Sequence, residues 1–230
     1  MINQTTLLVT ACGRPDLLYR TLTSLDRCHP LRNFAAVVVH EDMPGTDNSP
    51  TKTLFPFLQW LEPTERRGHM GALDELYRHV NSPFIFHCED DWEFYGGPFL
   101  VESFQRLNAE PNCLQVWLRA HNDTNEHPIV WVDGLPRMDV NGHLHTSGRG
   151  LRARPWRGFS LNPGLRRYKQ FGMFFFSMTA NGFKGWAAEK TIGEYFYQHG
   201  YYAGITANLL GYCRHIGEGR HMEDTGGAEC

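Results

Sequence analysis

Three acidic residues stand next to one another directly after an apolar stretch of the chain. Phe84–Cys88 has the composition of a buried strand, and Glu89, Asp90 and Asp91 follow it. A buried carboxylate without a partner costs several kcal/mol of folding free energy, so a hydrophobic core gains nothing from three of them. A divalent cation between the carboxylates would remove that cost, and Mg²⁺ and Mn²⁺ prefer such oxygen ligands. The run indicates either a metal site or a strand that ends in water with a run of charge.

A second acidic pair also follows an apolar stretch. Ala35–Val39 is built of small and β-branched residues, which favours a strand, and His40, Glu41 and Asp42 come after it. The earlier run Leu7–Thr10 predicts the first strand. Strands that alternate with helices indicate right-handed crossovers and a mostly parallel sheet. Because such sheets bind ligands beyond the carboxyl ends of their strands, we expect both acidic groups to line one crevice.

Helical patterns separate these strands. Leu18, Leu22 and Leu25 recur on one face of a helix whose first turn suits Pro15. The other segments of this half are assigned from periodicity and composition: a helix at Ala72–Val80, a helix after Gly96-Gly97-Pro98, a loop at Met43–Lys52 and an apolar segment of undecided type at Leu54–Leu61.

The second half of the chain has fewer regular helices. We expect strands at Leu114–Leu118, Ile129–Val132, Phe174–Met178 and Tyr201–Ala207, a helix from Trp186 to His199, a loop over Asn141–Lys169 and a Gly-rich polar tail over Arg214–Cys230. Neither a linker nor an internal repeat divides the sequence. This predicts one domain over residues 1–230, with a nucleotide-binding half at about 1–112 and a second half at about 113–230.

Composition places the chain among ordinary globular proteins. It has 230 residues, of which 41% are hydrophobic and 20% charged, and a formal net charge of −3. That balance gives no general reason to expect nucleic acid or an acidic membrane as a partner. The six cysteines are scattered and the amino-terminal residues lack the pattern of a signal peptide. No apolar run has the length of a membrane-spanning helix. We expect a cytoplasmic protein that would meet a membrane only through its surface.

Taken in order, the motifs resemble those of GT-A fold glycosyltransferases, in particular the inverting family 2 and N-acetylglucosaminyltransferase-like enzymes. The resemblance covers most of the chain. It rests on Thr10-Ala11-Cys12-Gly13-Arg14-Pro15, Glu41-Asp42, Gly68-His69-Met70-Gly71, Glu89-Asp90-Asp91-Trp92 as a DXD-type motif, Gly185-Trp186-Ala187-Ala188-Glu189 and His215-Ile216-Gly217. It implies an α/β GT-A fold, with a mostly parallel central sheet flanked by helices and a more irregular carboxyl-terminal half on the acceptor side.

The resemblance also implies a donor and a metal. The donor would be a nucleotide sugar, usually a UDP sugar, whose diphosphate is neutralised by Mn²⁺ or Mg²⁺. Asp91 matches the residue that binds the metal directly, and either His215 or His221 would complete the coordination. The other matches place these residues at the donor: Thr10, Cys12, Arg14, Glu41 or Asp42, Arg66 or Arg67, Gly68, His69, Gly71 and Asp90, the last near the ribose or the waters of the metal.

Inverting transfer needs a general base that deprotonates the acceptor hydroxyl. Glu189 matches the family's base, at the start of a helix after a Gly-Trp turn, where the helix dipole favours the ionised form. Many relatives have a Glu-Asp pair, whereas this chain has Glu189-Lys190. Glu194 is the alternative base.

Seven cations between Arg149 and Lys169 fall where relatives build the acceptor side. With the interleaved Trp156 and Phe159 they predict either a grip on a phosphate-bearing acceptor or a solvated basic loop. Such an acceptor would be a lipid-linked sugar, a phosphorylated glycan or modified nucleic acid.

Three other interpretations compete with this one. A sugar-nucleotide pyrophosphorylase-like nucleotidyltransferase would need a Gly-rich loop after the first strand, whereas the chain has the single Gly13 there. The chain would also suit a nucleotide-sugar-binding protein without catalytic activity. A structural zinc site would draw on Cys213, His215, His221 and Cys230, although their spacing matches no established zinc pattern.

Overall fold

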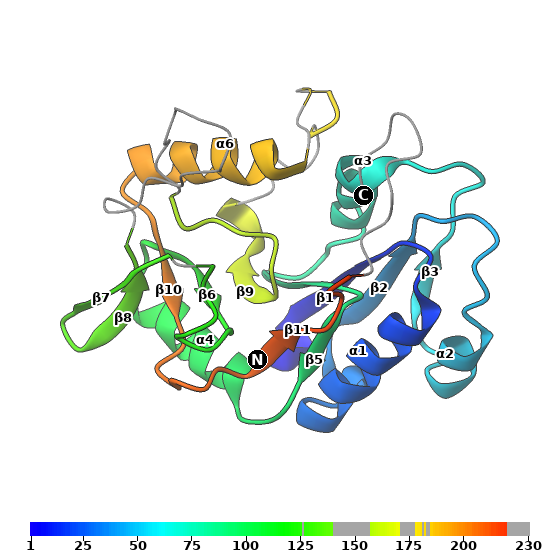
Figure 1. Cartoon of the computed structure of the whole chain (residues 1–230), viewed down its shortest axis with the longest axis horizontal. Helices are drawn as coiled ribbons and strands as arrows, with labels where there is room; N and C mark the ends of the chain where they lie inside the picture. The colour runs from blue at the N-terminus through cyan, green and yellow to red at the C-terminus, as the bar shows by residue number, and fades with distance from the viewer. Residues whose placement is uncertain (126, 140–156, 171–177, 181, 183–184, 220–230) are drawn as a thin grey trace.

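A computed structural model describes residues 1–125, 127–139, 157–170, 178–180, 182 and 185–219. Its central element is a nine-stranded sheet (Figure 1). In spatial order the strands are β3 (Gln59–Leu61), β2 (Ala36–Glu41), β1 (Thr5–Ala11), β4 (Phe84–Glu89), β9 (Gly164–Arg167), β6 (Cys113–Trp117), β10 (Tyr202–Ile205), β8 (Leu135–Met138) and β7 (Ile129–Val132).

The sheet is mostly parallel, as the sequence predicted. The β1 strand pairs in parallel with β2 and β4, β2 with β3, and β6 with β10. The exceptions are β9, which is antiparallel to both β4 and β6, and β8, which is antiparallel to β10 and forms a hairpin with β7. The hairpin turns at Asp133 and Gly134, both with positive φ, as a two-residue turn requires.

Helices cover both faces of the sheet. α1 (Pro15–Cys28), α2 (Ser49–Leu54) and α4 (Phe99–Ala109) lie on one side, and α3 (Gly68–Tyr77) and α6 (Gly185–Gln198) on the other (Figure 1). Successive residues of a strand point to opposite faces, so a strand buried on both sides is apolar throughout. In β1, Leu7 and Val9 pack with the α1 and α4 side, and Leu8 packs with the α3 and α6 side. Short 3₁₀ helices occupy Ile2–Gln4 and Leu31–Asn33.

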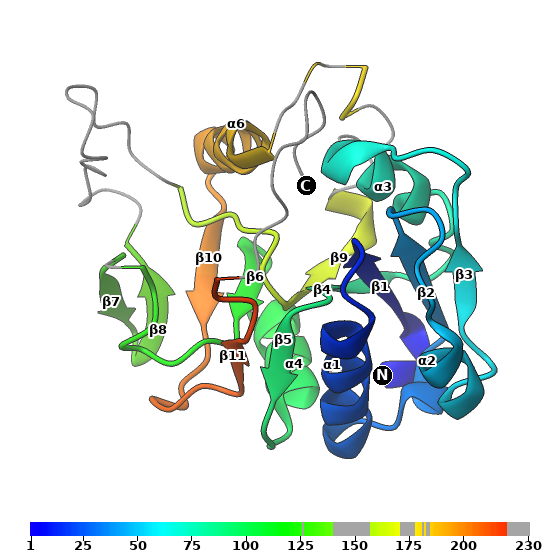
Figure 2. The same ribbon diagram turned by 45° about the vertical axis from the view of Figure 1, so that its right-hand side comes forward.

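A second, two-stranded sheet lies beside the main one. β5 (Trp92–Phe94) follows directly after the acidic run and pairs antiparallel with β11 (Cys213–His215) (Figure 2). His215 stands opposite Trp92 in this pairing. The late histidine is thereby brought to the acidic run by backbone hydrogen bonds.

Several local predictions were wrong. The Gly-rich polar tail assigned from Arg214 begins within β11, and the predicted loop over Asn141–Lys169 contains β9. The predicted loop Met43–Lys52 runs into α2 at Ser49, and α3 begins at Gly68, four residues before Ala72. Short strands and helix starts carry few residues of pattern, so composition alone misplaces them. The strand expected at Phe174–Met178 lies outside the described residues, apart from Met178.

Two further properties of the described part concern redox state and membranes. Cys12, Cys28, Cys88, Cys113 and Cys213 are free thiols. None of the helices in that part combines the length and the apolar character needed to cross a bilayer.

Candidate active site

The carboxyl ends of β1, β2 and β4 meet at one edge of the sheet. In register, Ala11 stands opposite Glu41, and Thr10 opposite Glu89. Beyond β1, the Gly13 N–H donates to Glu41 Oε1 at 2.8 Å, and the Cys12 N–H to Asp90 Oδ2 at 3.3 Å. The two acidic groups therefore contact the same loop after β1, as the strand-end argument predicted.

Arg14 holds both aspartates of the acidic run. Its Nε donates to Asp90 Oδ2 at 3.2 Å and its Nη1 to Asp91 Oδ2 at 2.9 Å, while Nη2 donates to Asp90 Oδ1. Thr21 of α1 donates its hydroxyl to the Asp90 carbonyl at 2.7 Å. Burial raises the pKa of Asp90 to about 6, although the guanidinium of Arg14 opposes that shift. A single positive charge, that of Arg14, therefore pairs with two carboxylates at the end of β4.

Asp91 meets His215 across the chain. His215 Nε2 lies 3.0 Å from Asp91 Oδ2, and the Ile216 N–H donates to the Asp91 carbonyl at 2.8 Å. Burial opposes ionisation of Asp91, but the His215 hydrogen bond and the charge of Arg14 outweigh it and lower the pKa of Asp91. The same bond raises the pKa of His215. The second oxygen, Asp91 Oδ1, is buried and has no hydrogen-bond partner among the described residues.

Glycine at position 217 makes this contact fit. A Cβ atom at Gly217 would lie 2.3 Å from Asp91 Oδ2, far inside van der Waals contact. Only glycine lets the backbone after β11 approach the carboxylate this closely.

Glu89 has the most strongly raised pKa of the three acids in the run. Burial and the neighbouring charge of Asp91 raise the pKa of Glu89 to about 8. Its Oε2 accepts a hydrogen bond from Trp92 Nε1 at 3.2 Å. The carboxyl group is therefore mostly protonated at neutral pH in the absence of a bound cation.

Two cavities adjoin Glu89. The donor-side cavity, of about 60 Å³, is lined by Thr10, Ala11, Cys12, Arg14, Asp42, His69, Ala72, Glu89 and Asp90. The polar cavity, of about 470 Å³, is lined by Glu89, Trp92, Arg119, Asp123, Asn125, Asn162, Arg214, His215 and Glu218. Glu89 lines both, so the two cavities meet at the acidic run.

Structural comparison identifies the fold. No known family profile and no curated protein sequence matches the chain. Its structure is similar to the mannosyltransferase PcManGT from Pyrobaculum calidifontis in complex with GDP-Man and Mn²⁺, with a TM-score of 0.61 and 16% identity over 94% of this chain. The chain has the GT-A fold.

Other GT-A structures match as extensively. GalNAc-T7 with UDP, GalNAc and Mn²⁺ has a TM-score of 0.64 at 12% identity over 93% of this chain. S. aureus TarS 1–349 in complex with UDP has a TM-score of 0.56 at 11% identity over 91%. The chain spans 58%, 43% and 59% of the lengths of these three structures. It corresponds to only about half of each neighbour.

In this GT-A domain, Glu41 and Asp42 hold loops. Asp42 accepts the N–H groups of Arg67 at 2.7 Å and Gly68 at 3.0 Å, at the start of α3. Besides Gly13, Glu41 accepts from Met43 N at 3.0 Å and Asn48 Nδ2 at 3.1 Å. Both carboxylates are largely satisfied by protein donors, so their direct contribution is to shape the loops around the donor-side cavity.

Of the remaining residues expected at the donor, His69 lines the same cavity. Arg66 Nη2 points to Cys12 Sγ at 3.7 Å. Burial lowers the pKa of His69 to about 4, so its imidazole is neutral. A Cβ atom at Gly71 would meet Arg67 Cβ at 2.8 Å, which fixes glycine in the first turns of α3. His221 lies outside the described residues.

Glu189 lies on α6 and supports a loop. Its Oε1 accepts the Leu161 N–H at 2.5 Å and the Ser160 hydroxyl at 3.1 Å. Burial raises the pKa of Glu189. The alternative base, Glu194, is half-exposed and ion-paired with Arg157 Nε at 2.8 Å. That ion pair compensates the negative charge of Glu194 at the surface.

Arg166 is a central residue that the sequence did not single out. It was one of seven cations in a predicted loop, yet it is completely buried on β9. Its Nε donates to Gln115 Oε1 at 3.2 Å, and its Nη2 donates to the carbonyls of Ser160 and, at 3.2 Å, Asn162. Glu89 and Glu189 both lie close enough to favour its charge. No local signal separates this arginine from its neighbours, because its burial depends on the pairing of β9 with β4.

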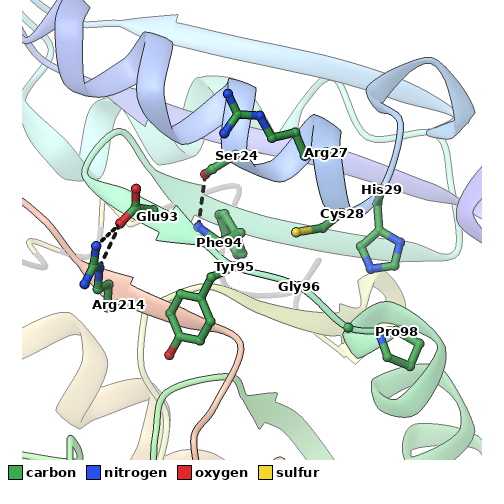
Figure 3. Close-up of a pocket in the computed structure, with 11 residues that line it drawn as sticks. Ser24, Arg27, Cys28, His29, Glu93, Phe94, Tyr95, Gly96, Pro98 and Arg214 are labelled. Carbon is green, nitrogen blue, oxygen red and sulfur yellow. Dashed lines mark hydrogen bonds and ion pairs between the residues drawn. The ribbon is translucent and has the colours of Figure 1, made fainter.

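A further cavity lies away from these carboxylates. It measures about 960 Å³ and lies between the end of α1, β5 and the turn before α4 (Figure 3). Ser24 Oγ accepts the Phe94 N–H at 3.0 Å on one side of it, and Glu93 pairs with Arg214 at its edge. It contains none of the strand-end carboxylates, so we place no chemistry there.

The zinc alternative gains no support from the described residues. Cys213 is buried, and burial raises the pKa of its thiol. Across the described ranges, no three His, Cys, Asp or Glu side chains come together as a metal-binding group. His221 and Cys230, the other residues of that interpretation, lie outside those ranges.

Proposed function

We propose that the protein is a metal-dependent glycosyltransferase that moves a sugar from a UDP sugar to an acceptor hydroxyl. The observation that carries this proposal is the meeting of Asp91 and His215, 3.0 Å apart although 124 residues separate them in sequence. A buried, unpartnered carboxylate oxygen stands beside them. The meeting point lies beyond the carboxyl end of β4, where α/β sheets bind ligands.

The donor atoms present fit a divalent cation. Asp91 offers a carboxylate and His215 an imidazole, a combination compatible with Mn²⁺. Since the described residues supply only these two side chains, the diphosphate and water would provide the remaining ligands. When bound, such a cation neutralises charge on the departing diphosphate.

The donor would lie along the strand ends. Asp90, which accepts hydrogen bonds from Arg14 and the Cys12 N–H, would also accept hydrogen bonds from ribose hydroxyls. Arg66 at the same rim supplies a guanidinium of the type that suits phosphate oxygens. Two of the three similar structures named above hold UDP and one holds GDP-Man, which supports a nucleoside diphosphate sugar and favours uridine.

Glu189 is the proposed general base for transfer with inversion. Its raised pKa makes the carboxylate a stronger base than an ordinary glutamate. Both hydrogen bonds from described residues end on Oε1, so Oε2 is the atom that would take the acceptor proton. Arg166 lies near enough to stabilise the ionised form.

The first test is donor binding. UDP with Mn²⁺ should raise the melting temperature, by roughly 5–10 °C at a hundredfold excess over Kd. Asp91→Ala should abolish the shift because it removes a ligand of the cation. Glu62→Gln, in the exposed ion pair with Lys52, is the control and should keep the shift. If no nucleoside diphosphate stabilises the wild type with either Mn²⁺ or Mg²⁺, the proposal is wrong.

The second test concerns the base. Glu189→Gln should lower the rate of transfer about a hundredfold or more while the UDP-dependent melting shift persists, because general-base catalysis contributes at that level. Release of UDP from a panel of UDP sugars measures the rate. Transfer at the wild-type rate in this variant would exclude Glu189 as the base.

A further inference from the structure

The polar cavity next to the proposed metal site has a defined charge pattern. It adjoins His215 and Glu89 and is bounded by the loop after β6 and by Asn162. If the proposed function holds, this is the space from which an acceptor hydroxyl would approach the donor sugar. Its lining therefore selects the chemical class of the acceptor.

Both described arginines that line the cavity pair with a carboxylate. Arg119 donates from Nε to Asp123 Oδ2 at 3.1 Å and from Nη2 to Asp123 Oδ1 at 2.5 Å. Arg214 donates from Nε to Glu93 Oε2 at 2.7 Å. An arginine that is fully engaged by a carboxylate has little left to offer a phosphate group. Each guanidinium that the described residues place at this cavity therefore already has a carboxylate partner, shared with Arg20 in the case of Arg214.

The cations of the adjoining basic segment are engaged elsewhere as well. Arg166 is buried among backbone carbonyls, and Arg167 donates to the carbonyls of Cys113, at 3.0 Å, and Leu107. Arg157 pairs with Glu194 and lies over the ring of Tyr197 at 3.7 Å. Of the cations that the structure describes in this segment, Lys169 alone is exposed.

What the cavity also offers is hydrogen-bonding capacity from uncharged and acidic groups. Asn125 and Asn162 contribute amides, and Glu218 a carboxylate. The face of Trp92 is covered by Arg119, whose guanidinium carbon lies 5.4 Å from the ring centroid. A ligand there would be held by hydrogen bonds to hydroxyl groups rather than by stacking or by ion pairs.

We propose that the polar cavity binds an uncharged, polyhydroxylated acceptor, that is, a neutral saccharide, and rejects one with a phosphate group beside the reacting hydroxyl. This rests on the proposed function and replaces the sequence-based expectation of a phosphate-bearing acceptor. Asn162, at the end of the Ser160–Asn162 segment, contributes one wall. Glu189 and Arg166 hold that wall from either side.

Saturation-transfer difference NMR tests the proposal. The wild type, with UDP and Mg²⁺, is titrated with maltose, lactose and N,N′-diacetylchitobiose as neutral probes and with glucose 6-phosphate as the charged probe. At least one neutral saccharide should bind, and glucose 6-phosphate should bind more weakly than it. Asn162→Ala should weaken the neutral saccharide about tenfold, the usual effect of one lost hydrogen bond to a neutral group.

A gain of phosphate binding gives the sharper test. Asp123→Asn removes the carboxylate that neutralises Arg119, so glucose 6-phosphate should bind at least about tenfold more tightly than to the wild type. Glu62→Gln should change neither ligand. The proposal is overturned if glucose 6-phosphate binds the wild type more tightly than every neutral saccharide, if no neutral saccharide binds, or if Asn162→Ala leaves neutral binding intact.

The melting shift with UDP and Mn²⁺ distinguishes a failure of the acceptor proposal from a failure of the glycosyltransferase proposal. Both variants should retain it, which also shows that they fold. A wild-type shift without saccharide binding overturns the acceptor proposal alone. Absence of the shift in the wild type overturns the glycosyltransferase proposal on which it rests.

Discussion

A single arginine neutralises the aspartates that the proposed metal site needs. Arg14 lies between Asp90 and Asp91 and donates to both. A divalent cation at Asp91 would have to bind beside this guanidinium, and like charges only a few ångströms apart repel each other strongly in a partly buried site. The diphosphate of a donor would supply the missing negative charge. We therefore expect the metal and the nucleotide to bind cooperatively.

Arg14→Gln should remove the repulsion. Without nucleotide, Mn²⁺ should bind this variant about tenfold more tightly than the wild type, as measured from the electron paramagnetic resonance signal of free Mn²⁺. Arg20→Gln, which breaks an exposed ion pair with Glu93, should leave Mn²⁺ affinity unchanged. Equal or weaker Mn²⁺ binding by Arg14→Gln would show that Arg14 does not oppose the cation.

His29 makes a pH-dependent contribution to stability. It is buried at the end of α1 with its ring edge-on to Phe99, and burial lowers the pKa of His29 to about 4 from the usual 6.5. The unfolded chain therefore binds the proton more readily below pH 6.5. The free energy of unfolding should fall as pH drops from about 6.5 to about 4, by roughly 2 kcal/mol at pH 5. Urea titrations at several pH values measure it.

A matched pair of variants separates His29 from the other groups that titrate in this range. His29→Asn should flatten the decrease, whereas His79→Asn, at an exposed histidine, should not. An unchanged slope in His29→Asn would assign the pH dependence to another residue.

At the scale of elements, β11 decides the composition of the site. It pairs with β5 and carries His215 to the end of β4, and the chain then passes over Asp91 at Gly217.

Gly217→Ala should push the backbone away from Asp91 and abolish or strongly reduce the melting shift with UDP and Mn²⁺. The nearby Gly219 has open space around its Cβ position, so Gly219→Ala should keep the shift despite some strain from its positive φ. A normal shift in Gly217→Ala would mean that the loop can move without loss of the site.

At the scale of the molecule, β9 joins the two halves of the chain. It is antiparallel between β4 of the first half and β6 of the second. Its Arg166 contacts the hydroxyl of Tyr77 on α3 and Gln115 on β6. A sheet that is continuous through β9 should unfold as one unit, and the single domain expected from the sequence stays a prediction that this unfolding would test.

Arg166→Met tests this connection. It leaves the buried carbonyls of Ser160 and Asn162 and the amide of Gln115 without their donor, so unfolding free energy should fall by about 3 kcal/mol or more. Arg32→Met, at the surface over the ring of Phe57, should cost less than about 1 kcal/mol. Urea denaturation followed by circular dichroism measures both. Two separate transitions in the wild type would contradict a single cooperative domain.

The sequence by itself determined the front half of the fold. Leu18, Leu22 and Leu25 specify their helix through local periodicity, and the apolar runs before Glu41 and Glu89 specify buried strands. Because parallel strands present their carboxyl ends at one edge, the meeting of the two acidic groups also followed from sequence. These features depend on neighbours a few residues apart.

Only the tertiary structure decided the rest. The choice of His215 as the partner of Asp91, the bond of Arg14 to two aspartates and the burial of Arg166 all depend on strand pairings between distant segments. An arginine in a polar stretch has the same neighbours in sequence whether its side chain is solvated or bound to buried carbonyls. The sequence pattern of Arg149–Lys169 therefore does not distinguish Arg166 from the other cations. Long-range pairing, which leaves little trace in local composition, determines where such charges lie.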